Sequence, residues 1–230
     1  MSSPSPAHRT VAGVVAAGAV AGATLTAYAL AEARAYTLRR VTVPVLPPGS
    51  PDLRVLHLSD VHLTPGQRRK REWLRGLAGL RPDLVVDTGD NMAHPDAVPA
   101  VLESYGELLA APGVFVFGSN DYYSPTLRNP LKYLLPDDGT RHTDAPELPW
   151  RELRDAFTGA GWADLTNTRT TIEVRGVRIA FAGVDDPHLS YDRLDEIAGP
   201  ADPDADLRLG VAHAPYLRVL DQLAADGYDA

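Results

Sequence analysis

The chain has 230 residues, of which 44% are hydrophobic, and a formal net charge of -8. That length suits one domain with a single substantial core, and the negative charge argues against a nucleic-acid-binding surface, which would need clustered Lys and Arg. The chain has no cysteine, which excludes disulfides and thiolate metal sites and leaves Asp, His and Asn as candidate metal ligands.

The first predicted element is an apolar segment within residues 1–40. Residues 11–31 carry no charge and are long enough to cross the hydrocarbon core of a bilayer. We predict a transmembrane anchor or a cleavable signal helix here, and we prefer both to the alternative of a buried core helix. A signal helix is included because the A-x-A arrangements at residues 27–29 and 33–35 suit signal cleavage. The protein is therefore expected at the cell membrane. Its orientation stays open because Arg residues flank both ends of the segment.

In the rest of the chain, short apolar runs alternate with longer amphipathic stretches, which is typical of an α/β domain. Residues 41–52 are rich in Pro and Gly and form a predicted linker, and residues 53–230 form the predicted catalytic domain. Expected strands cover residues 54–58, 84–88, 114–117 and 207–211, and a hairpin at residues 171–182 turns across Arg175-Gly176. Expected helices cover residues 69–80, 97–111, 150–160 and 216–225. Residues 122–149 are irregular and Pro-rich for their length, which is typical either of a lid or binding loop or of a packed surface loop.

Polar side chains of metal-binding types follow the apolar strands. Asp60 and His62 come after the first strand, Asp90 after the second, Asn120 after the third, and His213 after a later one. Open α/β sheets place functional groups at the carboxyl ends of their strands. Asp60 and His62, two apart on extended chain, are expected to share a face and to bind one ion. Each Asp taken alone would more simply cap the next helix, and only the combination favours a metal site.

The ordered motifs D-x-H, G-D-N, G-S-N-D and H-x-P resemble those of the calcineurin-like metallophosphoesterases from residue 53 onward. More closely, the chain is similar to the membrane-linked bacterial branch typified by YkuE and YaeI. The resemblance implies a β-sandwich flanked by helices and a dinuclear centre of Mn, Fe or Zn. Asp60, His62 and Asp90 would hold one ion, and Asp90, Asn120 and His213 the other. The implied mechanism is hydrolysis by water activated between two ions about 3.5 to 4 Å apart.

Two departures from the family pattern matter. Asp121 stands where the family usually has a His beside the leaving group, so we predict Asp121 as the general acid, which requires a raised pKa. The family also closes its site with a G-H-x-H motif after H-x-P, whereas this chain ends at residues 227–230 without one. We expect a C-terminally incomplete domain in which each ion lacks a ligand. Inactivity of the 230-residue chain itself is the alternative to hydrolysis.

Other polar residues receive simpler interpretations. His57 is expected to be structural or to support the site, and His94 and His142 to lie on the surface. Asp185, Asp186 and His188 follow a strand but suit a turn about as well, so they stay outside the predicted metal set. The basic run at residues 68–71 is expected to be a solvated helix start, with contact to an anionic substrate or lipid headgroups as the alternative.

The expected function is hydrolysis of phosphomonoesters or phosphodiesters. The aromatic and aliphatic residues after Asp121 motivate the hypothesis of a lipid-linked or nucleotide-sugar substrate, and we expect no nucleic-acid partner. The alternative is a non-catalytic metal-binding or interaction module, favoured by the missing motif and by Asp121. The sequence shows no G-x-S-x-G elbow and no glycine-rich phosphate loop before a Lys.

Overall fold

The computed structural model describes residues 6–126, 141 and 143–230, with side chains from residue 18 onward. The chain divides into two compact units, Met1–Thr42 and Val43–Ala230. The first contains helix α1, Pro6–Glu32, which includes the apolar run at residues 11–31. Within the residues that the structure describes, no helix combines the length and the hydropathy that a membrane crossing requires. The predicted transmembrane helix therefore stays a prediction.

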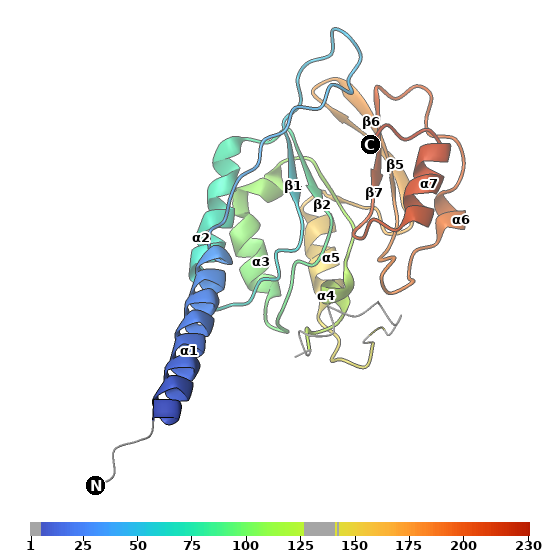
Figure 1. The fold of residues 1–230 in the computed structure, drawn as a ribbon. Helices are drawn as coiled ribbons and strands as arrows, with labels where there is room; N and C mark the ends of the chain where they lie inside the picture. The colour runs from blue at the N-terminus through green and yellow to red at the C-terminus, as the bar shows by residue number, and fades with distance from the viewer. Residues whose placement is uncertain (1–5, 127–140, 142) are drawn as a thin grey trace. The chain divides into compact units, whose positions relative to one another are not determined.

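The second unit contains two β-sheets (Figure 1). The first is parallel, in the order β1-β2-β3-β4, with β1 at Val55–Leu58, β2 at Leu84–Asp87, β3 at Gly113–Phe115 and β4 at Ala163–Asp164. The second has the order β5-β6-β7, with β5 at Thr168–Val174, β6 at Val177–Gly183 and β7 at Leu207–Val211. β5 and β6 pair antiparallel, and β6 and β7 pair parallel.

The inner faces of the two sheets share one hydrophobic core. Side chains of a strand point alternately to its two faces, and in β3 Val114 joins this core while Phe115 points the other way. Ile179 and Phe181 of β6 meet Val114 from the second sheet. The two sheets therefore form a sandwich.

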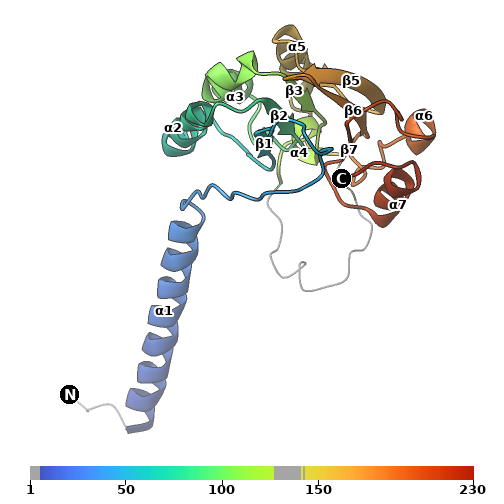
Figure 2. The ribbon, with the colours of Figure 1, turned by 90° about the horizontal axis from the view of Figure 1, so that it is seen from above.

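Helices cover the outer faces of the sandwich, as Figure 2 shows from above. On the first sheet lie α2 (Arg68–Gly76), α3 (Val98–Tyr105) and α5 (Trp150–Gly159), together with the 3-10 helices η1 (Leu77–Leu80) and η2 (Gly106–Ala110). On the second sheet lie α6 (Leu194–Ile197) and α7 (Leu217–Ala225). The short helix α4, Ser119–Tyr122, follows β3. The architecture is an α/β fold with a parallel sheet and flanking helices, in agreement with the predicted class.

The β5–β6 hairpin shows how the local sequence sets the fold. Arg175 and Gly176 both have positive φ, 52° and 79°, and Val174 pairs with Val177 on either side of them. A two-residue turn with positive φ at both positions matches the twist of the strands it joins. The predicted turn at Arg175-Gly176 is confirmed, and both strands extend beyond the predicted residues 171–182.

Candidate metal centre

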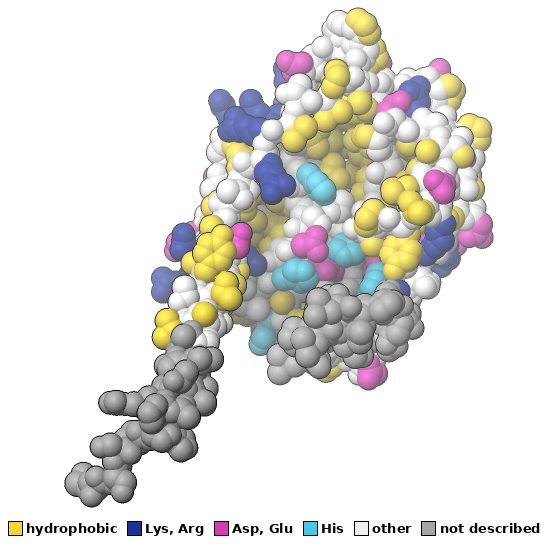
Figure 3. All heavy atoms as spheres, viewed as in Figure 1, with side chains coloured by type: hydrophobic (Ala, Val, Ile, Leu, Met, Phe, Trp, Pro, Cys, Tyr) yellow, Lys and Arg dark blue, Asp and Glu magenta, His cyan; other side chains and the backbone are white. Residues whose placement is uncertain are grey.

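The five residues predicted as metal ligands lie close together. β1, β2 and β3 are parallel neighbours, so their carboxyl ends meet at one edge of the first sheet, where the segments with Asp60, Asp90 and Asn120 follow. His213 follows β7 of the second sheet and lies beside Asp90. In the face shown in Figure 3, acidic and histidine side chains gather in one place.

Asp60, His62 and Asp90 form a group with metal-ligand geometry. Their ligand atoms all lie within 4.8 Å of one another. His62 Nε2 is 3.7 Å from Asp60 Oδ1 and 3.5 Å from Asp90 Oδ2. Two carboxylates and one imidazole at these distances suit a borderline divalent cation such as Mn, Fe or Zn.

A second group of residues also contacts Asp90. His213 Nε2 is 3.7 Å from Asp90 Oδ2, and Asn120 donates its backbone N–H to Oδ1 and its Nδ2 to Oδ2, both at 2.7 Å. Rotating the Asn120 amide by half a turn exchanges its nitrogen and oxygen, which presents a carbonyl ligand at the same place. Asp90 is thus the residue that the two groups share.

The tautomer of His213 follows from its other nitrogen. Nδ1 lies 2.7 Å from the carbonyl oxygen of Thr88, an acceptor only, so Nδ1 carries the hydrogen and Nε2 is free to bind a cation. Burial by itself would lower the pKa of His213, but the charges of Asp90, Asp186 and Asp60 and the hydrogen bond to Thr88 O together raise the pKa above its ordinary value. A cation held by Asp90 would oppose that protonation.

The backbone of this site is not extended, contrary to the expectation for Asp60 and His62. Asp60, His62 and Asp90 have φ of 53°, 43° and 58°, the left-handed region that non-glycine residues rarely adopt. The two loops hold one another in this conformation, since Asp60 N–H donates to Gly89 O and His62 N–H donates to Asp90 O. Asp60 and His62 converge because the chain coils, and not because side chains alternate along a strand.

Two glycines allow the loops to approach this closely. A Cβ on Gly118 would lie 2.4 Å from Asp90 Oδ1 and 2.6 Å from the ring of His213. A Cβ on Gly89, whose φ is 91°, would lie 2.3 Å from the backbone nitrogen of Gly118. The glycines of the G-D-N and G-S-N-D motifs therefore make room for the ligands themselves.

Asp121 does not fit the predicted role of general acid. Its side chain is fully buried, and its two oxygens accept backbone N–H groups of Asp90 at 2.6 Å, Asn91 at 2.8 Å and Gly118 at 3.0 Å. Burial, with the nearby charge of Asp90, raises the pKa of Asp121 to about 8. The raised pKa agrees with the prediction, but a carboxyl facing three backbone amides cannot reach a leaving group. Asp121 ties the loop after β2 to the loop after β3.

A buried network that the sequence did not reveal supports the same loop. Asp87 Oδ1 accepts Asn91 Nδ2 at 3.0 Å, and the Tyr105 hydroxyl lies 2.8 Å from Asp87 Oδ2 and 2.5 Å from Asn91 Oδ1. All three residues are fully buried, and burial raises the pKa of Asp87 to about 6. A tyrosine has one hydroxyl hydrogen for these two acceptors. If Asp87 is protonated, its Oδ2 donates a hydrogen bond to the Tyr105 hydroxyl, and that hydroxyl donates its own hydrogen to Asn91 Oδ1. Both contacts of the hydroxyl are then hydrogen bonds.

Asp186, left outside the predicted metal set, borders the site. It is fully buried, and its Oδ1 accepts the N–H of His188. Its Oδ2 has no hydrogen-bond partner among the described residues, and burial raises its pKa despite the attraction of His213. Asp186 follows the end of β6, and the same position at the end of a strand selected Asp90 as a candidate ligand. The sequence therefore contained the signal that could have included Asp186.

The remaining sequence predictions have mixed outcomes. His57 is exposed in β1, and its Nε2 lies 2.9 Å from Thr88 Oγ1, which agrees with a supporting role. His94 is exposed, as expected. In the basic run, Lys70 donates to the carbonyl of Val61 and Arg71 pairs with Glu103, so part of it is engaged within the fold. His142 and most of the predicted lid, residues 127–140, lie outside the described residues.

Comparison with known proteins agrees with the class that fold and site define, a metal-binding phosphoesterase sandwich. The sequence profile of the calcineurin-like phosphoesterases matches residues 53–227, and the chain belongs to this family. The chain is also 31% identical over 109 residues to a transmembrane protein with metallophosphoesterase domain from Bos taurus. That alignment covers 46% of this chain and 24% of the relative, so the chain spans about a quarter of the relative's length.

Proposed function

We propose that this protein hydrolyses phosphomonoesters or phosphodiesters with two divalent cations held on either side of Asp90. The observation that carries the proposal is the position of Asp90 Oδ2, 3.5 Å from His62 Nε2 and 3.7 Å from His213 Nε2. A carboxylate between two imidazoles that approach from different loops suits a ligand shared by two ions. Asp60 completes the first set and Asn120 the second.

The electrostatics of the site support bound cations. Asp60 and Asp90 approach one another around His62, and the buried carboxyls of Asp121 and Asp186 lie within electrostatic range of Asp90. Such a concentration of acidic groups is costly unless positive charge or protons neutralise it. Two bound cations would also lower the pKa of a water molecule and stabilise the negative charge that develops on a phosphoryl group.

The residues of this chain then have separate tasks. Asp90, His62 and His213 supply ligand atoms at fixed positions, because the coiled loops hold their backbones in place. Asp121 fixes the spacing between the two loops, through backbone amides on each of them. Because the Asp and His side chains of the ligand set would be occupied by the cations, the proposed mechanism uses direct attack by water.

Metal analysis combined with turnover of bis-p-nitrophenyl phosphate tests the proposal. We expect the purified chain to retain Mn, Fe or Zn and to hydrolyse the diester. Asp90→Ala should lose both properties, while the control Asp96→Ala, at an exposed residue, should keep them. A chain that binds no divalent cation at any tested concentration would refute the proposal.

A non-catalytic metal-binding module is the second candidate. It is favoured by one observation: Asp121, which stands where the family usually has a His beside the leaving group, is fully buried and accepts three backbone N–H groups. The same experiment separates the two functions, because a chain that retains metal in an Asp90-dependent way but turns over no phosphoester would support the module.

We also propose that residues 1–40 associate with the membrane, as an anchor or a signal segment. The support is the uncharged run at residues 11–31 and the membrane protein from Bos taurus named above. The lipid-linked or nucleotide-sugar substrate stays a prediction, since it rested mainly on residues that the structure does not describe. Comparing turnover of such substrates with that of simple aryl phosphodiesters tests it, and equal rates would argue against lipid selectivity.

A further inference from the structure

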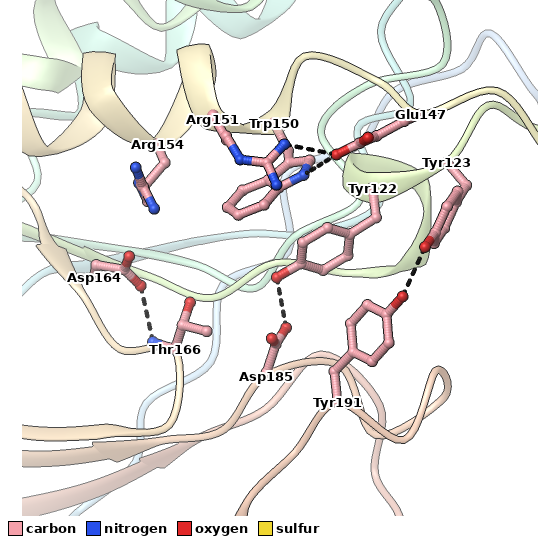
Figure 4. A pocket seen from close by; sticks show the side chains of 10 residues that line it. All are labelled: Tyr122, Tyr123, Glu147, Trp150, Arg151, Arg154, Asp164, Thr166, Asp185 and Tyr191. Atoms are coloured by element: carbon pink, nitrogen blue, oxygen red, sulfur yellow. Dashed lines mark hydrogen bonds and ion pairs between the residues drawn. The ribbon is translucent and has the colours of Figure 1, made fainter. Parts of the chain in front are cut away.

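A pocket of about 320 Å³ lies beside the proposed metal centre. Its lining comes from the end of α4 and the residue after it, from Glu147 and the first half of α5, from β4 and the turn after it, and from the segment that follows β6 (Figure 4). Two of its residues adjoin the site just described, since Tyr122 follows Asp121 and Asp185 precedes Asp186. The volume is near the lower end for small-molecule sites, which suits a ligand of one ring.

The charges around the pocket favour a neutral ligand. Its walls carry three carboxylates, those of Glu147, Asp164 and Asp185, and two guanidinium groups, those of Arg151 and Arg154. Arg151 already pairs with Glu147 and stacks 4.3 Å over the ring of Trp150. The carboxylates would repel an anionic ligand and the guanidinium groups would repel a cationic one. The pocket therefore favours neither sign of ligand charge.

The pocket offers both donors and acceptors to such a ligand. Thr166 lines it, and the buried Oγ1 of this residue has no hydrogen-bond partner among the described residues. The amide of Thr166 occupies one oxygen of Asp164. The hydroxyls of Tyr123 and Tyr191 bond to each other at 2.7 Å, which leaves one of their two hydrogens for a further acceptor. Ligand hydroxyl groups, which donate and accept at once, complement this mixture.

Aromatic rings supply an apolar surface for the face of a ring. Tyr122 packs edge-on against both Trp150 and Tyr191, with ring centroids 5.1 and 5.4 Å apart. In Figure 4 these rings lie on one side, and Asp164 and Thr166 lie across from them. An apolar wall opposite polar groups suits a ring with a C–H face and a hydroxyl-bearing edge.

We infer that this pocket binds a neutral polyhydroxylated ring, such as a single sugar unit. The link to catalysis rests on the proposed function, since the sugar would belong to a phosphoester whose phosphate reaches the neighbouring metal centre. Binding of the ring itself needs only the pocket.

Saturation-transfer NMR on the full chain tests the inference with methyl glucoside, methyl galactoside and methyl mannoside, and with adenine as a planar ring without hydroxyl groups. We expect transfer to the ring protons of at least one glycoside and none to adenine. Thr166→Val should weaken glycoside binding about tenfold, the loss of one good hydrogen bond. Its fold should persist because Oγ1 has no partner to lose. Arg154→Ala, at a pocket wall, should weaken binding as well.

Matched variants make the outcomes decisive. Thr171→Val, at an exposed position of β5, should bind the glycoside like the unaltered chain. Asp90→Ala should also keep glycoside binding, so failure of the proposed metal site and failure of this pocket are distinguishable. No transfer to any of the glycosides, preference for adenine, or equal binding by Thr166→Val and the unaltered chain would each overturn the inference.

Discussion

Single residues decide whether the two ligand groups can meet at Asp90, and Gly118 lies against two of the candidate ligands. Gly118→Ala would place a methyl group 2.4 Å from Asp90 Oδ1 and 2.6 Å from His213. Because the contacts involve both candidate ligands, we expect metal affinity to fall at least tenfold, measured by titration with Mn or Zn. Gly76→Ala in α2, where a Cβ has open space, is the matched control and should leave affinity unchanged. Unchanged affinity in Gly118→Ala would contradict the role of Asp90 and His213 as ligands.

Asp87 gives a residue-scale prediction of pH dependence. Its pKa is raised to about 6 by burial, so the folded state holds its proton more tightly than the unfolded state does. The associated stability is fully present below the unfolded pKa near 3.9 and is lost as the pH rises through about 6. Asp87→Asn mimics the protonated acid, since its amide can donate to Tyr105.

The measurement is urea unfolding of both proteins at several pH values. Between about pH 4.5 and about pH 7.5, the free energy of unfolding should fall by about 2 kcal/mol more in the unaltered chain than in Asp87→Asn. Tyr105→Phe, which removes the shared hydroxyl, should destabilise the protein at all these pH values. Parallel pH profiles for the unaltered chain and Asp87→Asn would show that Asp87 is ionised in the fold.

At the scale of elements, the sequence predicted the main strands and helices because their signals are local. The apolar run at residues 207–211 matches β7, and the Arg175-Gly176 turn is where the pattern placed it. β4 has two residues, Ala163–Asp164, too few for any periodicity, and it exists through its pairing with β3.

The closeness of the candidate ligands was predictable from the sequence, but their geometry was not. The strand-end rule selected Asp60, Asp90, Asn120 and His213 as candidates, because parallel strands bring their ends together. It could not show that Asp121 turns inward, since its three backbone donors come from two loops that meet only in the fold. Left-handed backbone at Asp60 and His62 likewise depends on bonds to the loop after β2.

The packing of helix α5 on the first sheet gives a prediction about stability. Its apolar face puts Phe157, which is fully buried, against Phe115 of β3, with ring centroids 5.3 Å apart, and parallel to the ring of Tyr105. Phe157→Ala should lower the free energy of unfolding by about 3 to 5 kcal/mol through lost burial and a cavity. Thr158→Ala, at the exposed neighbour, should change it by less than about 0.5 kcal/mol. Urea unfolding measures both, and a small effect of Phe157→Ala would mean that this face of the sheet is loosely packed.

At the scale of the whole molecule, the chain divides into the units Met1–Thr42 and Val43–Ala230. Val45, Leu46 and Leu53, near the start of the second unit, pack against its hydrophobic core. The family match, residues 53–227, lies within the same unit. Catalysis and folding are thus expected to reside in the second unit, and membrane association in the first.

Removing residues 1–42 tests that division. The shortened chain should keep the thermal midpoint and the metal affinity of the full chain, because the second unit contains the core and all five candidate ligands. Only the full chain should co-sediment with phosphatidylglycerol–phosphatidylethanolamine vesicles, because the uncharged run at residues 11–31 gains apolar contacts there. Introducing Asp at Val20 within that run should abolish co-sedimentation and leave metal binding intact, since a charge in the apolar core of a bilayer is costly. Equal sedimentation of the full and shortened chains would place any membrane affinity in the second unit.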